Sequence, residues 1–150
     1  MDNFTEKEFE EIYNFIKSKL IIDKEVCNEQ RVYVLGGQPG AGKSTLTSRI
    51  EEKMKNNIIV INGDDFRSYH PNYKNLVKAY GDDSVLYTQK FSNAITEKLI
   101  EDLGNEKYNL IVEGTLRTTE APLKTSKLLH SKGYSTNLNI VCVKPEFSYL

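Results

Sequence analysis

The chain has 150 residues, of which 39% are hydrophobic and 27% are charged, a balance typical of one globular domain. Its formal net charge of −1 argues against the broad positive surface of nucleic-acid-binding proteins. No apolar run approaches the roughly 20 residues that span a bilayer, and the charged N-terminus lacks the pattern of a signal peptide. Cys27 and Cys142 stand in no metal or redox spacing. These features predict a cytoplasmic protein with reduced cysteines.

Residues 1–30 are expected to form an N-terminal amphipathic helix followed by a polar linker. Thr5 and Glu8 have the spacing of a capping box. We expect the helix to end near Leu20 and to pack its apolar face on the rest of the chain, with partner binding as the alternative. The linker covers residues 23–30. The apolar residues at helical spacing are Phe9, Ile12, Tyr13, Ile16 and Leu20.

Residues 37–44 match G-x-x-x-x-G-K-[ST], the pattern of a loop that wraps nucleotide phosphates. An apolar run at residues 31–35 precedes this loop, and apolar residues at helical spacing follow it up to residue 55. We expect Lys43 to open a helix and to reach the β and γ phosphates of ATP, and the Ser44 hydroxyl to bind Mg²⁺. The predicted nucleotide-binding residues are Gly37, Gln38, Pro39, Gly40, Ala41, Gly42, Lys43, Ser44 and Thr45.

Strands and helices alternate from residue 31 to residue 150, which we interpret as one domain. This alternation predicts an α/β fold, a P-loop NTPase-type parallel sheet flanked by helices. In the long helix, Phe91, Ile95, Leu99 and Leu103 form the expected inner face. After the first strand, the expected strands cover residues 58–62, 108–113 and 137–143, and the expected helices cover a short piece within 72–80, then 84–103 and 122–132.

Asp64 and Asp65 directly follow the second expected strand. The carboxyl ends of parallel strands form the ligand-binding edge of such sheets. Phosphoryl transfer needs a carboxylate there to accept the proton of the acceptor hydroxyl. We favour Asp64 as this base because it is nearer the strand, and we expect Asp65 to cap the following turn. A capping role for both aspartates is the alternative.

The third strand ends at Glu113 in the manner of a Walker B acid, which makes Glu113 a candidate for binding Mg²⁺ through water or for binding the acceptor. Arg117 follows in a loop with Thr115, Thr118 and Thr119. One fixed positive charge among hydroxyls suits a phosphate or sugar, although a solvated turn is the alternative. Glu97 breaks the apolar pattern of its helix, and that pattern alone predicts a solvent-exposed side chain.

Four blocks of the sequence resemble the zeta toxin family, the kinase toxins of epsilon/zeta toxin–antitoxin systems. The blocks are residues 37–44, 61–71, 91–97 and 108–117. The most specific are the aspartate–Phe–basic–x–x–His–Pro pattern that ends at Pro71 and the Glu-Gly-Thr-x-Arg-Thr-Thr pattern that starts at Glu113. The resemblance extends from about Arg31 to Leu150 without a large gap.

The resemblance implies a kinase that uses ATP and Mg²⁺ to phosphorylate the 3′-hydroxyl of the amino sugar in UDP-N-acetylglucosamine, which blocks cell-wall synthesis. By position it assigns Asp64 as the general base, Lys43 as the phosphate-loop lysine and Ser44 as the magnesium-binding hydroxyl. It also implies an epsilon-type antitoxin as protein partner, with a helix of the antitoxin in the ATP site. The residues that it assigns to the nucleotide sugar are Glu97, Glu113, Thr115, Arg117 and Thr125.

Members of the family continue beyond the fourth strand into a segment with two arginines that clamp the transferring phosphate. No residue of this sequence fills those positions, so we expect a kinase domain that is incomplete at its C-terminus. An arginine of that kind can be worth about 10³–10⁵ in rate. Two alternatives therefore stay open. The chain is either a non-catalytic remnant that binds nucleotide or antitoxin, or another small-molecule phosphotransferase with the same loop.

Overall fold

The computed structural model of the protein describes residues 3–37, 43–115 and 120–141. None of the helices in these stretches combines the length and the apolar character needed to cross a bilayer. The elements in chain order are helix α1 (Glu6–Leu20), strand β1 (Arg31–Gly37), helix α2 (Lys43–Lys53), strand β2 (Ile59–Asn62), 3₁₀ helix η1 (Gly63–Tyr69), helix α3 (Tyr73–Tyr80), 3₁₀ helix η2 (Gly81–Asp83), helix α4 (Ser84–Asn105), strand β3 (Leu110–Thr115), helix α5 (Glu120–Ser131) and strand β4 (Ser135–Val141).

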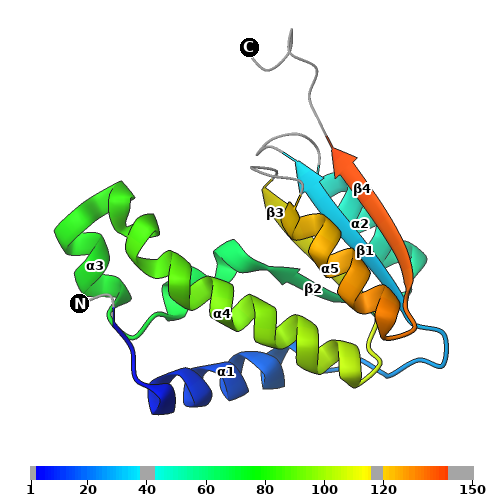
Figure 1. Ribbon diagram of the computed structural model, residues 1–150, viewed down its shortest axis with the longest axis horizontal. Helices are drawn as coiled ribbons and strands as arrows, with labels where there is room; N and C mark the ends of the chain where they lie inside the picture. The colour runs from blue at the N-terminus through cyan, green and yellow to red at the C-terminus, as the bar shows by residue number, and fades with distance from the viewer. Residues whose placement is uncertain (1–2, 38–42, 116–119, 142–150) are drawn as a thin grey trace, which may run out of the picture.

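The strands form one parallel sheet in the order β2-β3-β1-β4 (Figure 1). From β1 the chain passes over β3 to reach β2 at the edge, and it later passes over β1 to reach β4. Each of these connections carries at least one helix, which is how parallel strands are usually joined. The predicted α/β fold with a parallel sheet is confirmed.

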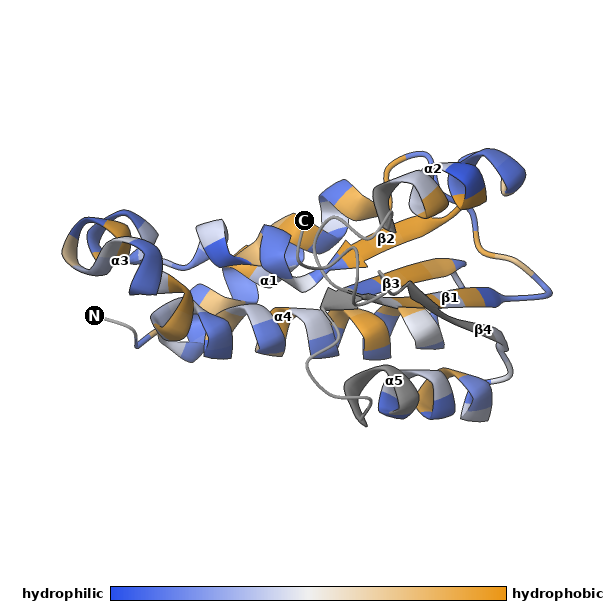
Figure 2. Cartoon of the chain, turned by 90° about the horizontal axis from the view of Figure 1, so that it is seen from above, coloured by the Kyte–Doolittle hydropathy of each residue, from blue (hydrophilic) through white to orange (hydrophobic). Residues whose placement is uncertain are grey.

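Helix α2 covers one face of the sheet, and α4 and α5 cover the other (Figure 2). Side chains alternate between the two faces along each strand. Tyr33, Leu35 and Ile111 therefore face α2 and pack with its Ile50. The opposite face joins a larger core that includes residues of α1, α4 and α5. Its strand residues are Val32, Val34, Ile59, Ile61, Leu110 and Val112.

Helix α1 lies alongside α4, as Figure 1 shows, and closes the larger core. Its capping box is present, because Thr5 Oγ1 accepts the N–H of Glu8 at 3.1 Å and Glu8 Oε1 accepts the N–H of Thr5 at 2.9 Å. Tyr13 and Ile16 are buried. The apolar face predicted for this helix is therefore used in packing.

Several element boundaries differ by one or two residues from the sequence-based prediction. Strand β3 covers Leu110–Thr115, two residues further along the chain than expected, because Gly114 and Thr115 continue the ladder with β1. Helix α5 begins at Glu120, before the expected Pro122. Strand β4 begins at Ser135, while residues 142–143 of its expected range lie outside the described residues. Backbone pairing with β1 extends β3 and β4 beyond their apolar runs. Hydrophobicity alone does not predict this extension.

Candidate functional site

The carboxyl ends of β1, β2 and β3 lie at one edge of the sheet. Gly37 at the end of β1 is in register with Thr115 at the end of β3, and Asn62 at the end of β2 is in register with Glu113. Strand β1 leads to α2 on one face of the sheet, and β3 leads to α5 on the other (Figure 2). A crevice between two strands whose connections diverge in this way is the usual ligand site of an open parallel sheet.

In sequence, the predicted phosphate loop lies between β1 and α2. Helix α2 begins at Lys43, as expected, whereas β1 continues two residues beyond its apolar run to Gly37. Thr45 is exposed on the first turn of α2. Residues 38–42 and the side chains of Lys43 and Ser44 lie outside the described part of the chain. The backbone brings the N-terminus of α2, which carries the positive end of the helix dipole, to the edge where the strands end.

Both carboxylate oxygens of Glu113 accept hydrogen bonds. The Thr47 hydroxyl on α2 donates to Oε1, and Asn62 Nδ2 at the end of β2 donates to Oε2 at 3.2 Å. Thr47 is buried and Glu113 is half-buried. A carboxylate held from two sides keeps further lone pairs for a ligand. Glu113 therefore has a fixed orientation at this edge of the sheet.

Asp64 lies in the first turn of η1, immediately after β2. Its backbone N–H donates to Asn62 Oδ1 at 3.1 Å, so Asn62 is the N-cap of this turn. The expected capping role of Asp65 is therefore wrong for this turn, because the side chain of Asn62 is the cap. The Asp64 side chain is 64% exposed, and its Oδ1 pairs with Arg67 Nη2 at 3.3 Å.

Asp65 lies next to two other carboxylates. Desolvation raises the pKa of Asp65 above its ordinary value, and the negative charges of Glu113 and Asp64 raise it further. The three acids therefore form one negative region at the carboxyl edge. Binding a cation there, or protonating one of the carboxylates, is favourable. This negative region lies at the same edge of the sheet as the end of β1, where the predicted phosphate loop starts.

The other predicted site residues are placed less closely together. Glu97 on α4 is exposed and Thr125 on α5 is half-buried. No hydrogen bond between described residues joins either side chain to Asp64 or Glu113. Thr115 belongs to β3, but its side chain is outside the described residues, and so is the whole of Arg117.

The His-Pro part of the 61–71 block lies away from the sheet edge. The His70 ring is buried and contacts the rings of Phe4 and Phe91 at centroid distances of 5.9 and 5.3 Å. Its Nδ1 accepts the N–H of Asn72 at 3.0 Å. His70 therefore packs the segment before α1 against α4.

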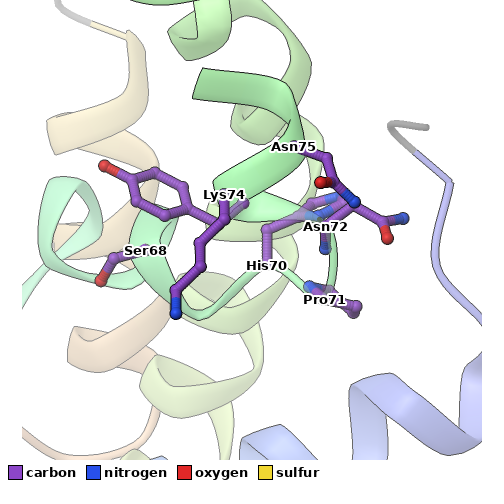
Figure 3. Close-up of a pocket in the computed structure, with 7 residues that line it drawn as sticks. Ser68, His70, Pro71, Asn72, Lys74 and Asn75 are labelled. Carbon is purple, nitrogen blue, oxygen red and sulfur yellow. Dashed lines mark hydrogen bonds between the residues drawn. The ribbon is translucent and has the colours of Figure 1, made fainter. Parts of the chain in front are cut away.

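A surface pocket of about 370 Å³ lies beside His70, between the end of η1 and the first turn of α3 (Figure 3). None of the residues predicted for the site lines this pocket, so we assign it no part in the chemistry below. The lining residues are Ser68, His70, Pro71, Asn72, Tyr73, Lys74 and Asn75.

Comparison with known proteins identifies the group to which this arrangement belongs. The family model described as Zeta toxin matches residues 19–150. The chain belongs to the zeta toxin family. It is 43% identical over 148 residues to Toxin zeta of Streptococcus pyogenes, covering 99% of this chain and 52% of that protein. It is 41% identical over 150 residues to Toxin PezT of Streptococcus pneumoniae serotype 4, covering 100% of this chain and 59% of PezT.

A solved structure from a study of the PezAT chromosomal toxin–antitoxin system of Streptococcus pneumoniae also matches. Its TM-score is 0.93 at 40% identity, covering 99% of this chain and 62% of that one. The zeta toxin fold therefore accounts for nearly the whole chain. The chain spans about half the length of the curated relatives it matches.

Three residues at this edge of the zeta toxin fold were missed by the sequence-based reasoning. They are Thr47 and Asn62, which bind Glu113, and Arg67, which binds Asp64. Arg67 falls within the family block, where it counts only as a basic residue. Asn62 falls within the same block and Thr47 outside all four, but the contacts of both depend on how segments 51 and 66 residues apart pack together.

Proposed function

We propose that the protein is a zeta-type toxin kinase that transfers the γ-phosphate of ATP to the 3′-hydroxyl of UDP-N-acetylglucosamine in the cytoplasm, which blocks cell-wall synthesis. The observation that carries the proposal is the common sheet edge: Glu113 lies on β3, the strand next to β1, and Asp64 follows β2 on the other side of β3. Membership of the zeta toxin family supports it. This arrangement has the parts that phosphoryl transfer needs, namely an anion-binding helix start and nearby carboxylates.

In the proposed reaction the 3′-oxygen of the sugar attacks the γ-phosphorus of ATP. A new P–O bond forms to the sugar, the bond between the γ-phosphorus and the β,γ-bridging oxygen breaks, and ADP leaves. Asp64 accepts the proton of the attacking hydroxyl. Lys43 binds the β and γ phosphates and stabilises the charge that develops on them.

Magnesium fits the donor chemistry at this edge. Desolvation and the charges of Glu113 and Asp64 raise the pKa of Asp65, and a divalent cation would relieve that repulsion. Among the described residues, no three His, Cys, Asp or Glu side chains converge as a ligand set. The Ser44 hydroxyl and the nucleotide phosphates would then supply ligands, which is how Mg²⁺ is commonly held. When bound, the cation neutralises charge on the phosphates.

The acceptor side of the proposed site is formed by residues that follow β3 or lie on α4 and α5. Glu113 offers a carboxylate with a fixed orientation for sugar hydroxyls or the amide N–H. Arg117 would pair with the diphosphate. The proposed set for the nucleotide sugar is Glu97, Glu113, Thr115, Arg117 and Thr125.

The test is to express the protein from its complete reading frame, to incubate it with ATP, Mg²⁺ and UDP-N-acetylglucosamine, and to detect phosphorylated nucleotide sugar by mass spectrometry. We expect the product with the natural acceptor and none with a 3′-deoxy analogue. ATP binding is measured in parallel by calorimetry. Bound ATP without any phosphorylated sugar would disprove the kinase assignment. Product with simple amino sugars or aminoglycosides instead would favour another small-molecule phosphotransferase.

We further propose an epsilon-type antitoxin as the protein partner. One solved relative comes from a study of a chromosomal toxin–antitoxin system, which supports this assignment. If the antitoxin occupies the nucleotide site, ATP and antitoxin compete. Calorimetric titration with the antitoxin, with and without saturating ATP, is expected to show weaker binding when ATP is present. Binding without any transferase activity would favour the non-catalytic alternative, and no binding would remove the partner proposal.

A further inference from the structure

We propose that Asn62 is a positioning residue that holds the Asp64 segment and the Glu113 carboxylate in one fixed arrangement. This inference rests on the proposed function, in which both acids act at the same site. The Asn62 side chain uses its two polar ends on the two partners. Its Oδ1 accepts the Asp64 N–H at 3.1 Å, and its Nδ2 donates to Glu113 Oε2 at 3.2 Å.

Only a residue with an acceptor and a donor on one short side chain can make both bonds. Asn62 ends β2 in register with Glu113, so the strand pairing already places the two side chains opposite each other. A hydroxyl at this position can cap the Asp64 N–H but is too short to reach Glu113 as well. An apolar residue leaves both partners without their bond.

The arrangement continues from Glu113 into the helix that follows the phosphate loop. Thr47 on α2 donates to Glu113 Oε1, the oxygen that Asn62 does not bind. A continuous chain of hydrogen bonds thus runs from α2 through Glu113 and Asn62 to the backbone of Asp64. This chain connects the segment that holds the phosphate donor with the proposed base.

Charge at this edge explains why such a hold is needed. Desolvation and the charges of Glu113 and Asp64 raise the pKa of Asp65, so the acids repel one another. An amide donor satisfies a carboxylate oxygen without adding a charge that competes with the phosphates. Displacing a reacting group by about 1 Å can cost about 10²-fold in rate, so a loss of position has a measurable effect.

Asn57, at the opposite end of β2 from Asn62, offers a matched control. Asn57 precedes β2, and like Asn62 it is half-buried. Its Oδ1 accepts the N–H of Glu25 at 2.8 Å, and its Nδ2 donates to Cys27 Sγ at 3.4 Å. Replacing Asn57 with alanine therefore removes a similarly bonded amide far from the carboxyl edge.

The experiment compares Asn62→Ala, Asn62→Ser and Asn57→Ala with the wild type in the phosphotransfer assay, all expressed from the complete reading frame. We expect Asn62→Ala to lower kcat about 10- to 100-fold while KM for both substrates changes less than about threefold. Asn62→Ser keeps the cap, so it should fold like the wild type and still lose kcat. Asn57→Ala should keep the wild-type kcat, whatever it does to stability.

Hydrogen exchange of the Asp64 amide gives a readout that needs no turnover. In Asn62→Ala this amide should exchange at least about fivefold faster than in the wild type, while Asn57→Ala leaves it unchanged. If the wild type transfers phosphate and Asn62→Ala has normal kcat, the positioning role is wrong and the proposed function stands. If the wild type transfers none, the proposed function fails, and unchanged exchange in Asn62→Ala would refute the structural hold as well.

Discussion

The guanidinium of Arg67 joins Asp64 to the first turn of α4. Its Nε and Nη2 donate to Asp64 Oδ1 at 3.4 and 3.3 Å, and its Nη1 donates to the carbonyl of Val85 at 3.0 Å. The Arg67 side chain is 21% exposed, much less than the 64% of Asp64. Arg67, which is anchored to α4, thereby orients the exposed carboxylate of Asp64.

Replacing Arg67 with methionine should lower kcat about 10-fold, because the proposed base loses its fixed orientation. The free energy of unfolding should change by less than about 1 kcal/mol, since exposed ion pairs contribute little. Arg67→Lys should give an intermediate kcat, because one ammonium cannot match the planar fork that reaches both partners. Steady-state kinetics and urea denaturation measure the two effects.

The control for this prediction is Lys132→Met. Lys132 pairs with Glu101 at 3.0 Å, and the two side chains are 17% and 50% exposed, which closely matches the Arg67–Asp64 pair. This change should leave kcat at the wild-type value. Equal kcat in the Arg67→Met variant and the wild type would show that the ion pair does not orient the base.

Asp64 and Asp65 should respond differently to the same substitution. Asp64→Asn is expected to reduce phosphotransfer by about 10²- to 10⁴-fold, since general base catalysis is worth about that much. Asp65→Asn should retain activity within about threefold. A larger loss in the Asp65 variant than in the Asp64 variant would move the base to Asp65. Both are measured at saturating ATP and nucleotide sugar.

Asp65→Asn should also stabilise the fold at neutral pH. Desolvation and the charges of Glu113 and Asp64 raise the pKa of Asp65 in the folded state. The folded protein therefore binds more protons than the unfolded chain above the unfolded pKa, and stability falls as Asp65 ionises. Relative to the wild type, the variant's melting temperature should be higher at pH 7, and the gap should close at pH values below 3.8, the ordinary pKa of the group.

Local sequence patterns predicted those features that depend on nearby residues. The Thr5–Glu8 capping box and the inner face of α4 both follow from helical spacing. All of Phe91, Ile95, Leu99 and Leu103 are fully buried. The phosphate-loop pattern likewise predicted that α2 begins at Lys43.

Local sequence patterns do not predict contacts between segments that are distant in the chain. The hydrogen bonds of Glu113 to Thr47 and Asn62 depend on strand order and register, which no local pattern contains. The η1 helix has no apolar periodicity, and its cap is Asn62 rather than the expected Asp65, because the turn begins directly at the end of β2. Register between parallel strands is set by packing over the whole sheet, so only the fold shows which residues meet at the site.

Replacing Tyr13 with phenylalanine should lower the free energy of unfolding by about 1–2 kcal/mol at pH 7. The Tyr13 hydroxyl donates to Asp102 Oδ2 at 2.5 Å and lies 3.2 Å from the Lys98 carbonyl, and both acceptors belong to α4. Tyr80→Phe, at an exposed position, is the control and should have no effect above about 0.5 kcal/mol. Urea denaturation followed by circular dichroism measures both.

The difference in stability between the wild type and Tyr13→Phe should decrease at alkaline pH. Burial, the hydrogen bond to Asp102 and nearby negative charges raise the pKa of Tyr13 above its ordinary value of 10.0. The folded state then binds more protons than the unfolded chain above pH 10, so wild-type stability falls as pH rises from there. The Phe variant lacks this slope, and the gap between the two proteins should narrow. A constant gap up to pH 11 would contradict the burial of the hydroxyl.

Gly104→Ala should destabilise the protein although alanine is the better helix former. Gly104 is buried on α4, and a Cβ there would lie 2.9 Å from Leu129 Cδ2 and 3.2 Å from Lys132 Cδ. Leu129 is fully buried, so it cannot move aside. Overpacking of this kind costs about 1–3 kcal/mol, which exceeds the roughly 1 kcal/mol that alanine gains in a helix.

Two further variants separate this clash from other effects of the Gly104 substitution. Lys90→Ala, at an exposed position of α4, should change stability by less than about 0.5 kcal/mol. The Gly104→Ala/Leu129→Ala double variant should be less destabilised than the sum of its single changes, because shortening Leu129 makes room for the new methyl group. Additive losses, or a more stable Gly104→Ala protein, would mean that α4 and α5 are not packed as closely as the distances indicate.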